Sequence, residues 1–495
     1  MALFTPREIA RDFLYMSFAR TMSLAISFVR SLVIPGLLGP LAYGMWKSLA
    51  MIQTYAQFGD LGVRAALKRE IPFYAGKGDT ARLSASRDVA FLVNNISILA
   101  AAVCTVGAAF LVDDSALGRA MLLFLPLLYT AHINSFMEQL LYARKEFTWM
   151  SRVNMWTGVL EAILAIGMTW GFGLKGLILG TALSYVIATW MQVRRVGYDL
   201  HLRWDTQVFR ELVNVGFPSH LNGLLYNIFL WVDRWLILSF LGLTSFGYYA
   251  LGMTINEYLF QFSYTLGNII SPRLVERYSE RENIEDLRQM VEVPMIVISR
   301  SAPAVLGVVY FASEAVVRTM LPRFEPGLLS LQILLVGTFF SSVPRGLSSF
   351  FITLRKQSQT VGLYVAAIGM NAALVWWLIS SDRGLPGAAA GTTTSLAFFG
   401  FGLIVMALRY FMGAKEIARF LLRLIWPLPF ALCLVGIGHF AATALSGGAP
   451  SMPRLVAGHA LGAAIFLALY SPVLVSLYRT YRSHLSSPTP PGAEA

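Results

Sequence analysis

The chain has 495 residues, of which 56% are hydrophobic and only 13% are charged, and its net charge is +12. A soluble domain has about 25% charged residues, so this composition excludes an ordinary soluble enzyme, a disordered chain and a disulfide-rich secreted scaffold. The mean hydropathy of +0.61 indicates a protein embedded in lipid, and the basic surplus then indicates loops beside an anionic cytoplasmic leaflet and no nucleic-acid partner.

Apolar segments long enough to cross a bilayer follow one another along the whole chain. About 20 apolar residues span the hydrocarbon core as a helix. The predicted spans are 12–36, 42–66, 89–111, 116–142, 153–171, 174–193, 213–240, 246–271, 291–313, 326–352, 359–380, 385–409, 420–443 and 454–477. These segments are too long for barrel strands and lack their alternation. We therefore predict an all-α integral membrane protein with about 14 transmembrane helices, or twelve or thirteen if one weak hairpin is misassigned.

The distribution of basic residues predicts the orientation of these spans. If both termini are cytoplasmic, one inner loop alone holds Lys68, Arg69, Lys77, Arg82 and Arg87. The outer loops hold only Arg119, Lys175, Arg318, Arg323, Arg383 and Arg454. Because Lys and Arg favour the cytoplasmic side, we predict cytoplasmic termini and an even number of spans.

A short motif recurs in the two halves of the chain. Gly39-Pro-Leu-Ala-Tyr43-Gly44 follows the first span, and Gly242-Leu-Thr-Ser-Phe246-Gly247 follows the seventh. Leu61-Gly62 and Leu266-Gly267 end the second span of each half. Six spans per half give two like-oriented lobes related by an axis along the membrane normal, with coincidental glycine-rich turns as the alternative. The predicted divisions are a six-helix lobe at 1–205, a second at 206–415, two additional transmembrane helices at 416–480 and a disordered cytoplasmic tail at 481–495.

Two stretches that contain this motif resemble a known family. LVIPGLLGPLAYGMWKSLAMIQTYAQFGDLGVRAALKREIPFYAGKGD and WVDRWLILSFLGLTSFGYYALGMTINEYL are similar to polysaccharide-synthesis membrane proteins, the lipid-linked oligosaccharide flippases. Their superfamily also contains multidrug exporters and lipid II flippases. The resemblance covers roughly residues 7–415 and implies a flippase in the bacterial inner membrane. Such a protein moves a polyprenyl-pyrophosphate-linked oligosaccharide to the outer leaflet for O-antigen, capsule or exopolysaccharide synthesis, beside other polysaccharide-assembly membrane proteins.

Ionisable residues within the spans form the candidate site, because each costs at least about 2.5–3.5 kcal/mol on insertion scales. The predicted substrate-binding cations are Arg20, Arg30, Lys47, Arg234, Arg300 and Arg345. Guanidinium binds phosphate oxygens bidentately and stays charged when desolvated. We therefore predict a cationic cavity that receives the pyrophosphate by alternating access, with structural ion pairs or interfacial anchors as the alternative for any single residue.

The acidic residues of the spans, and one arginine, are assigned to pairing or to ion coupling. These residues are Asp60, Arg64, Glu161, Asp233 and Glu257. Asp60 and Arg64 are four residues apart and are predicted to neutralise each other. Asp233 precedes an arginine, so the two side chains point to different faces and are expected to find partners on other helices. For Glu161 and Glu257 we predict pairing with the arginines, with binding of a coupling ion as the alternative.

Other patterns lack the context that their chemistry requires. The GxGxxG sequence at 171–176 lies in an outer hairpin with no strand before it, which excludes a nucleotide site. Gly176/Gly180 and Gly387/Gly391 have the spacing of close helix contacts. The histidines are scattered without ligand spacing, and no nucleophile with its base or Walker loop occurs. We therefore expect no metal, no cofactor and no enzymatic activity.

Three other functions are weighed against the flippase. A multidrug or organic-cation exporter would prefer a cavity lined with carboxylates, and the surplus of arginine counts against it. A lipid II flippase is an alternative within the superfamily. A membrane-embedded glycan polymerase or ligase needs a sizeable outer loop, and the predicted outer loops are short.

Overall fold

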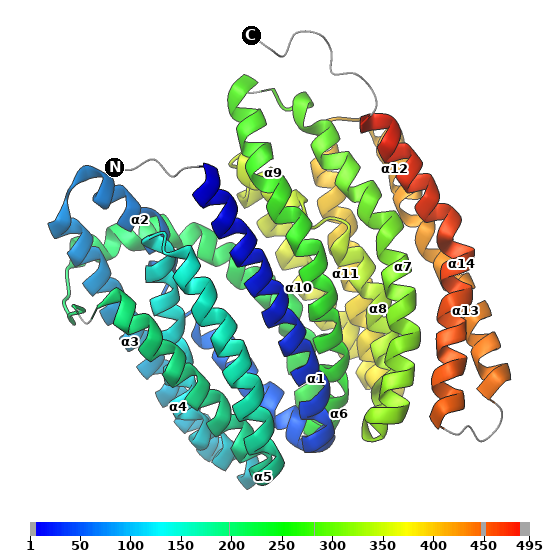
Figure 1. Ribbon diagram of the computed structural model, residues 1–495, viewed down its shortest axis with the longest axis horizontal. Helices are drawn as coiled ribbons and strands as arrows, with labels where there is room; N and C mark the ends of the chain where they lie inside the picture. The colour runs from blue at the N-terminus through cyan, green and yellow to red at the C-terminus, as the bar shows by residue number, and fades with distance from the viewer. Residues whose placement is uncertain (1–5, 198, 282, 447–451, 486–495) are drawn as a thin grey trace. The chain divides into compact units, whose positions relative to one another are not determined.

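The structure, a computed structural model, describes residues 6–197, 199–281, 283–446 and 452–485 (Figure 1). Side chains within this part are described except at 6–20, 219, 261–273, 281, 445–446 and 480–485. All regular elements of the described residues are helices, and ten helical segments are long and apolar enough to cross a membrane. The prediction of an all-α, multi-pass membrane protein is confirmed.

The helices follow one another with short connections. They are α1 (Pro6–Ala56), α2 (Val63–Lys77), α3 (Thr80–Leu111), α4 (Ser115–Ala143), α5 (Phe147–Val196), α6 (Thr206–Arg281), α7 (Arg288–Met320), α8 (Leu328–Ser342), α9 (Leu347–Thr353), α10 (Ser358–Leu378), α11 (Gly384–Leu408), α12 (Ala414–Ile425), α13 (Pro427–Ser446) and α14 (Met452–Leu485). The short helices are η1 (Glu285–Leu287), η2 (Pro322–Gly327) and η3 (Ile379–Arg383). Helix α14 continues into the predicted tail as far as Leu485, and residues 486–495 lie outside the described part.

Four of the ten candidate spans contain a break in the helical backbone. They are Thr21–Ala56, Phe147–Val196, His220–Phe260 and Ser358–Leu408, of 36 to 51 residues. Each contains a glycine with positive φ, and these are Gly39, Gly173, Gly242 and Gly384. A left-handed backbone interrupts a right-handed helix and favours glycine. Two crossings in each long segment agree with the predicted fourteen, and that number itself stays a prediction.

Helix α5 shows how the chain folds back at such a break. A Cβ on Gly176 would lie 1.9 Å from the carbonyl oxygen of Met168, and one on Gly180 would lie 2.6 Å from the carbonyl oxygen of Leu164. The two arms therefore pack at a distance that only glycine permits. Gly391 of α11 is packed closely against α10 in the same way. The close helix contacts predicted from the glycine spacing are confirmed.

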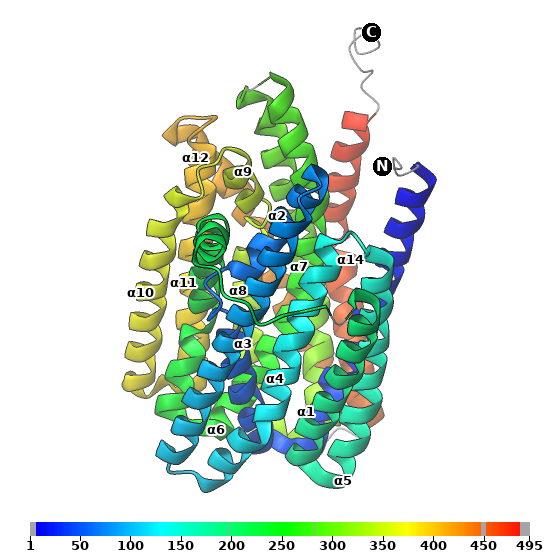
Figure 2. The ribbon, with the colours of Figure 1, turned by 90° about the vertical axis from the view of Figure 1, so that its left-hand side faces the viewer.

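The chain divides into two compact units. Unit 1 contains Met1–Asn227 and Leu243–Gly247, and its helices α3, α4 and α5 run side by side (Figure 2). Unit 2 contains Ile228–Gly242 and Tyr248–Ala495. Within unit 2, α13 and α14 pack against each other and against α7 around a core that includes Phe466 (Figure 1). The predicted lobe boundaries stay predictions.

The two copies of the repeated motif have the same local structure. Gly39 has φ 73° and ψ 173°, and Gly242 has φ 77° and ψ 179°. Four residues later each copy buries an aromatic ring, Tyr43 at 2% and Phe246 at 1% exposure. The two turns match in their backbone dihedrals and in the buried ring that follows. This match favours an internal repeat, and it argues against glycine-rich turns that are alike by coincidence.

The two copies also contact each other reciprocally within unit 1. A Cβ on Gly44 would lie 2.0 Å from the carbonyl oxygen of Leu243. A Cβ on Gly247 would lie 2.0 Å from the carbonyl oxygen of Pro40. The backbones of the two motif copies therefore touch where each copy carries its second glycine.

Candidate functional site

Arg30 and Glu161 form an ion pair between α1 and α5 in unit 1. The two side chains are 25% and 14% exposed. The predicted pairing of Glu161 with an arginine is therefore found. Because the carboxylate already neutralises the guanidinium, an anionic ligand at Arg30 would compete with Glu161.

Asp60 and Arg64 pair as the spacing predicts, at the joint between α1 and α2. Arg64 Nε donates to Asp60 Oδ2 at 2.6 Å, and its other nitrogens donate to Ser135 Oγ at 3.1 Å and to the Gln57 carbonyl at 2.6 Å. His220 Nδ1 lies 3.8 Å from Asp60 Oδ1. Partners from α4, α6 and the joint itself surround this pair, so the arrangement indicates a structural role.

Asp233 of α6 is fully buried in unit 2. Its carboxylate accepts hydrogen bonds from the Tyr249 hydroxyl, from Thr392 Oγ1 at 3.0 Å and from the Arg234 backbone N–H at 2.8 Å. Among the described residues, these three donors provide the hydrogen bonds that a buried carboxylate needs. The side chain thus joins the two arms of α6 to α11, which agrees with the expectation that Asp233 finds partners on other helices.

Arg234 points to a different partner from that of Asp233. Its Nη2 donates to Glu257 Oε1 at 3.1 Å, and its guanidinium carbon lies 4.1 Å from the ring centroid of Trp231. The arginine side chain is 9% exposed, whereas Glu257 is 48% exposed. Arg234 Nε is buried and has no hydrogen-bond partner within the described part of the chain. Arg234 therefore has a buried N–H group that the ion pair with Glu257 does not use.

The other predicted cations have different neighbours. Arg300 of α7 is 9% exposed, and its buried Nε has no hydrogen-bond partner among the residues described. Arg345, between α8 and α9, lies 5.2 Å from the Phe260 ring centroid. Lys47 lies 5.5 Å from the ring centroid of Tyr43. Arg20 lies in the part of α1 whose side chains are outside the described residues.

The predicted cations thus belong to both units. Arg30 and Lys47 lie in unit 1, and Arg234, Arg300 and Arg345 lie in unit 2. Within unit 2, the positive charge of Arg423 on α12 acts on Arg300. The prediction that these side chains line one cavity stays a prediction.

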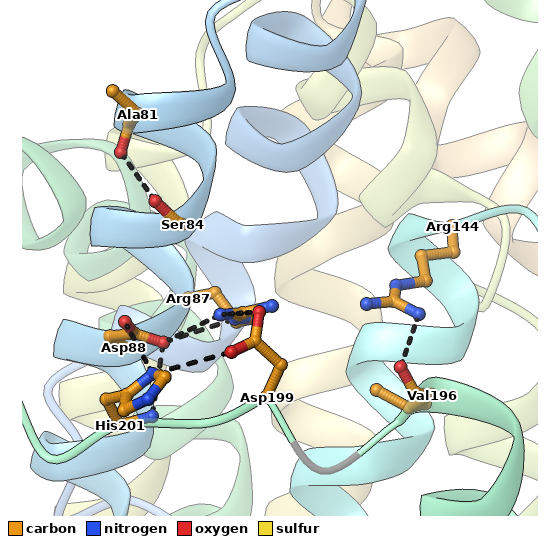
Figure 3. Close-up of polar contacts among 8 residues, drawn as sticks. All are labelled: Ala81, Ser84, Arg87, Asp88, Arg144, Val196, Asp199 and His201. Carbon is orange, nitrogen blue, oxygen red and sulfur yellow. Dashed lines mark hydrogen bonds and ion pairs between the residues drawn. The ribbon is translucent and has the colours of Figure 1, made fainter.

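Polar clusters that the sequence analysis missed lie elsewhere. At the start of α3, Arg87 Nη2 contacts Asp88 Oδ1 at 3.1 Å and Asp199 Oδ2 at 3.3 Å (Figure 3). His201 lies 3.7 Å from both carboxylates, so these contacts attach the segment after α5 to α3. Burial and the positive charge of Arg87 lower the pKa of the nearby Arg144, which donates to the Val196 carbonyl at 2.8 Å.

A second missed cluster brings together histidines that are far apart in sequence. Glu314 of α7 lies beside Arg318, His439 of α13 and His459 of α14. Glu314 and Arg318 are four residues apart on α7, which is the spacing of an ion pair on one helix face. The two histidines have no such spacing and become neighbours of Glu314 because α13 and α14 pack against α7.

Solved structures with the same fold are transporters. An inward-facing multidrug resistance MATE family transporter of the MOP superfamily has a TM-score of 0.66 at 14% identity, covering 83% of this chain and 98% of that chain. The lipid II flippase MurJ, in an inward closed conformation, has a TM-score of 0.67 at 13% identity, covering 94% and 99%. A MOP superfamily transporter from Pyrococcus furiosus Vc1 (DSM3638) has a TM-score of 0.58 at 14% identity, covering 83% and 96%. The fold is that of the helical MOP-superfamily transporters.

The sequence itself defines the family more narrowly. The family described as polysaccharide biosynthesis protein matches residues 33–323, which is more than half of the chain. The chain belongs to this family, and the resemblance drawn from its two motif-bearing stretches is confirmed. No curated protein matches the sequence.

Proposed function

We propose that the protein is a flippase that moves a polyprenyl-pyrophosphate-linked oligosaccharide from the cytoplasmic to the outer leaflet of the bacterial inner membrane. Membership of a polysaccharide biosynthesis family and the fold shared with transporters and a lipid II flippase support this function. Both termini lie in the cytoplasm, and the substrate meets a polar, cationic cavity while its polyprenyl tail stays in lipid. The product serves cell-surface polysaccharide synthesis.

The observation that carries the proposal is the presence of buried guanidinium groups with unused donors. Arg234 and Arg300 each bury an Nε that has no hydrogen-bond partner among the described residues. An unpaired donor on a desolvated cation is costly, and a phosphate oxygen would satisfy both its charge and its hydrogen bond. A pyrophosphate that crosses bare hydrocarbon would lose its hydration without such compensation.

The exporter of organic cations is the second candidate, and a multidrug resistance MATE family transporter has the same fold. A cation would need carboxylates that are free to bind it. Asp60 and Asp233 are instead buried and hydrogen-bonded, and Glu161 is paired with Arg30. Of these four acids, Glu257, at 48% exposure, is the most open to a ligand, yet it is paired with Arg234. These contacts favour an anionic substrate.

Translocation in proteoliposomes tests the proposal. The lipid-linked oligosaccharide is placed in the inner leaflet, and a membrane-impermeant glycosidase outside reports its arrival. We expect Arg234→Gln and Arg300→Gln to lower the rate by about 10- to 100-fold, because a hydrogen bond to a charged group contributes about 1.5–3 kcal/mol. Arg454→Gln, at an exposed position near the start of α14, is the matched control and should retain the wild-type rate.

Two results would contradict the proposal. Wild-type rates in both variants would exclude capture of the pyrophosphate by these arginines. Absence of glycan translocation, together with efflux of a cationic dye that Glu257→Gln abolishes, would identify the exporter instead.

A further inference from the structure

Three titratable side chains from three helices of unit 2 meet at one carboxylate oxygen. Glu314 Oε2 on α7 lies 3.4 Å from His439 Nδ1 on α13 and 3.4 Å from His459 Nε2 on α14. Glu314 is 1% exposed and His459 is 4% exposed. These three atoms are buried and have no hydrogen-bond partner in the part of the chain that the structure describes. Which of these three atoms carries a hydrogen follows from the other contacts of the same side chains.

The other nitrogen of His459 decides where the hydrogen of its ring lies. His459 Nδ1 is 2.8 Å from the carbonyl oxygen of Leu455, one helical turn earlier in α14. A carbonyl oxygen only accepts hydrogen bonds, so Nδ1 must carry a hydrogen and donate. In a neutral imidazole with a hydrogen on Nδ1, Nε2 has only a lone pair.

An additional proton is therefore required between His459 and Glu314. If His459 were neutral and Glu314 ionised, two acceptors would face each other in a site shielded from water. Even when His439 Nδ1 donates to the same oxygen, His459 Nε2 is left without a donor and faces another acceptor, which is unfavourable. One proton resolves it, either on His459 Nε2 as an imidazolium or on Glu314 Oε2 as a carboxylic acid that donates to the ring.

Charged groups also lie beside the other oxygen of Glu314. Arg318 Nη2 lies 3.0 Å from Glu314 Oε1, and Arg318 Nε lies 3.7 Å from Glu325 Oε1 of η2. The guanidinium thus contacts the Glu314 oxygen other than the one near the histidines, and Glu325 lies on the far side of Arg318. Tyr310 of α7 packs its ring against that of His439, with centroids 6.1 Å apart.

Among the described residues, the other elements packed on α7, which are η1, α8 and α12, add no titratable group that acts on this carboxylate. Helix α8 has the sequence LLSLQILLVGTFFSS, without an ionisable side chain. On α12, the charge of Arg423 acts on Arg300, which lies nearer the start of α7 than Glu314 does. Among the described residues, the groups that face Glu314 are thus Arg318 and the two histidines, with Tyr310 beside them.

We propose that Glu314 and His459 form a proton-binding site that holds one proton at neutral pH and fastens α14 to α7. The ligand is the proton itself, shared between the carboxylate and the imidazole, and His439 adds a second ring nitrogen to the same oxygen. Release of the proton leaves the two acceptors opposed across the contact between these helices. The proposal concerns the proton content of the folded chain and does not depend on which substrate the protein transports.

Nuclear magnetic resonance of the full-length protein with ¹⁵N-labelled histidine in nanodiscs at pH 7.5 tests the proposal directly. His459 is assigned by the signal missing from His459→Gln, or by elimination from variants of the other histidines if that variant does not fold. We expect hydrogen on Nδ1, and in addition either hydrogen on Nε2 or a carboxylic-acid stretch in the infrared spectrum that Glu314→Gln removes. Neutral His459 with hydrogen on one nitrogen and no carboxylic acid at Glu314 would overturn the site.

The pH dependence of thermal stability supplies a second measurement. At pH 7.5 the unfolded chain has an ionised Glu314 and a mostly neutral His459, so folding binds the proton and the melting temperature should fall as pH rises towards 9. In Glu314→Gln the side-chain amide can donate to Nε2 without a titratable proton, so this decrease should be lost. Glu325→Gln removes the same charge from the exposed side of Arg318 and should keep the wild-type decrease. An identical decrease in wild type and Glu314→Gln would contradict the proposal.

Discussion

At the scale of single residues, the described spans stabilise buried acids in two different ways. Glu161 is neutralised by the guanidinium of Arg30, whereas Asp233 receives neutral donors from Tyr249 and Thr392 and a backbone N–H. Each donor to an ionised carboxylate interacts with a full charge, so the loss of any one of them is costly. The hydroxyl of Tyr249 is therefore expected to contribute more to stability than an ordinary surface hydroxyl.

Removal of that hydroxyl tests this expectation. We predict that Tyr249→Phe lowers the free energy of unfolding by about 1.5–3 kcal/mol, the contribution of a hydrogen bond to a charged group. Tyr478→Phe, at a side chain that is 64% exposed, is the matched control and should change stability little. Denaturant or thermal unfolding of the purified protein measures both variants. Equal stability of Tyr249→Phe and wild type would exclude an ionised Asp233 held by this hydroxyl.

At the scale of elements, glycine decides where long helices reverse and how closely their arms approach. Gly39 and Gly242 adopt nearly the same left-handed turn in the two copies of the repeated motif. Gly44 and Gly247 then bring the two backbones into contact. Helix association in lipid gains little from the hydrophobic effect and depends on such close packing. The motif is therefore expected to be intolerant of even one added methyl group.

Alanine substitutions at these positions test that expectation. Gly44→Ala and Gly247→Ala should each reduce the yield of folded protein severely, because the new Cβ would lie 2.0 Å from a backbone carbonyl oxygen that cannot move as a side chain does. Gly107→Ala is the matched control, since a Cβ there meets nothing within 4 Å and alanine is the better helix former. Size-exclusion profiles and melting temperatures of the three variants give the comparison. Wild-type behaviour of Gly44→Ala would contradict the close contact.

At the scale of the whole molecule, the proposed substrate is an anion that moves outward. An inside-negative membrane potential favours this movement by about 2.3 kcal/mol per charge for each 100 mV. Because the proposed substrate is an anion, the potential is one source of driving force. A neutral or cationic substrate would respond to the potential differently, so the response identifies the charge that crosses.

Imposed potassium gradients with valinomycin test this response in proteoliposomes. We expect an inside-negative potential of 100 mV to raise outward translocation by up to about 50-fold per charge that crosses the whole field. Reversal of the gradient should lower the rate, and liposomes without protein should show neither change. A rate that does not depend on the potential would show that the moving complex carries no net charge.

The class of protein followed from properties that each segment carries by itself. The length and hydropathy of the apolar segments predicted an all-helical membrane protein, and glycines such as Gly39 and Gly242 marked the reversals. The spacing of Asp60 and Arg64 predicted their ion pair, because residues four apart lie on one helix face. The motif-bearing stretches identified the family, which the match over residues 33–323 confirmed.

The partners of the other buried charges were decided only by tertiary structure. Thr392 reaches Asp233, and His459 reaches Glu314, across more than a hundred residues of sequence. Span length, helix reversal and pairing within one turn are local, because they depend on hydropathy, backbone dihedrals and helical spacing. Contacts between helices in lipid depend on shape and on polar groups meeting across interfaces, and the apolar pattern of a helix that is hydrophobic on all sides does not specify which face meets which neighbour.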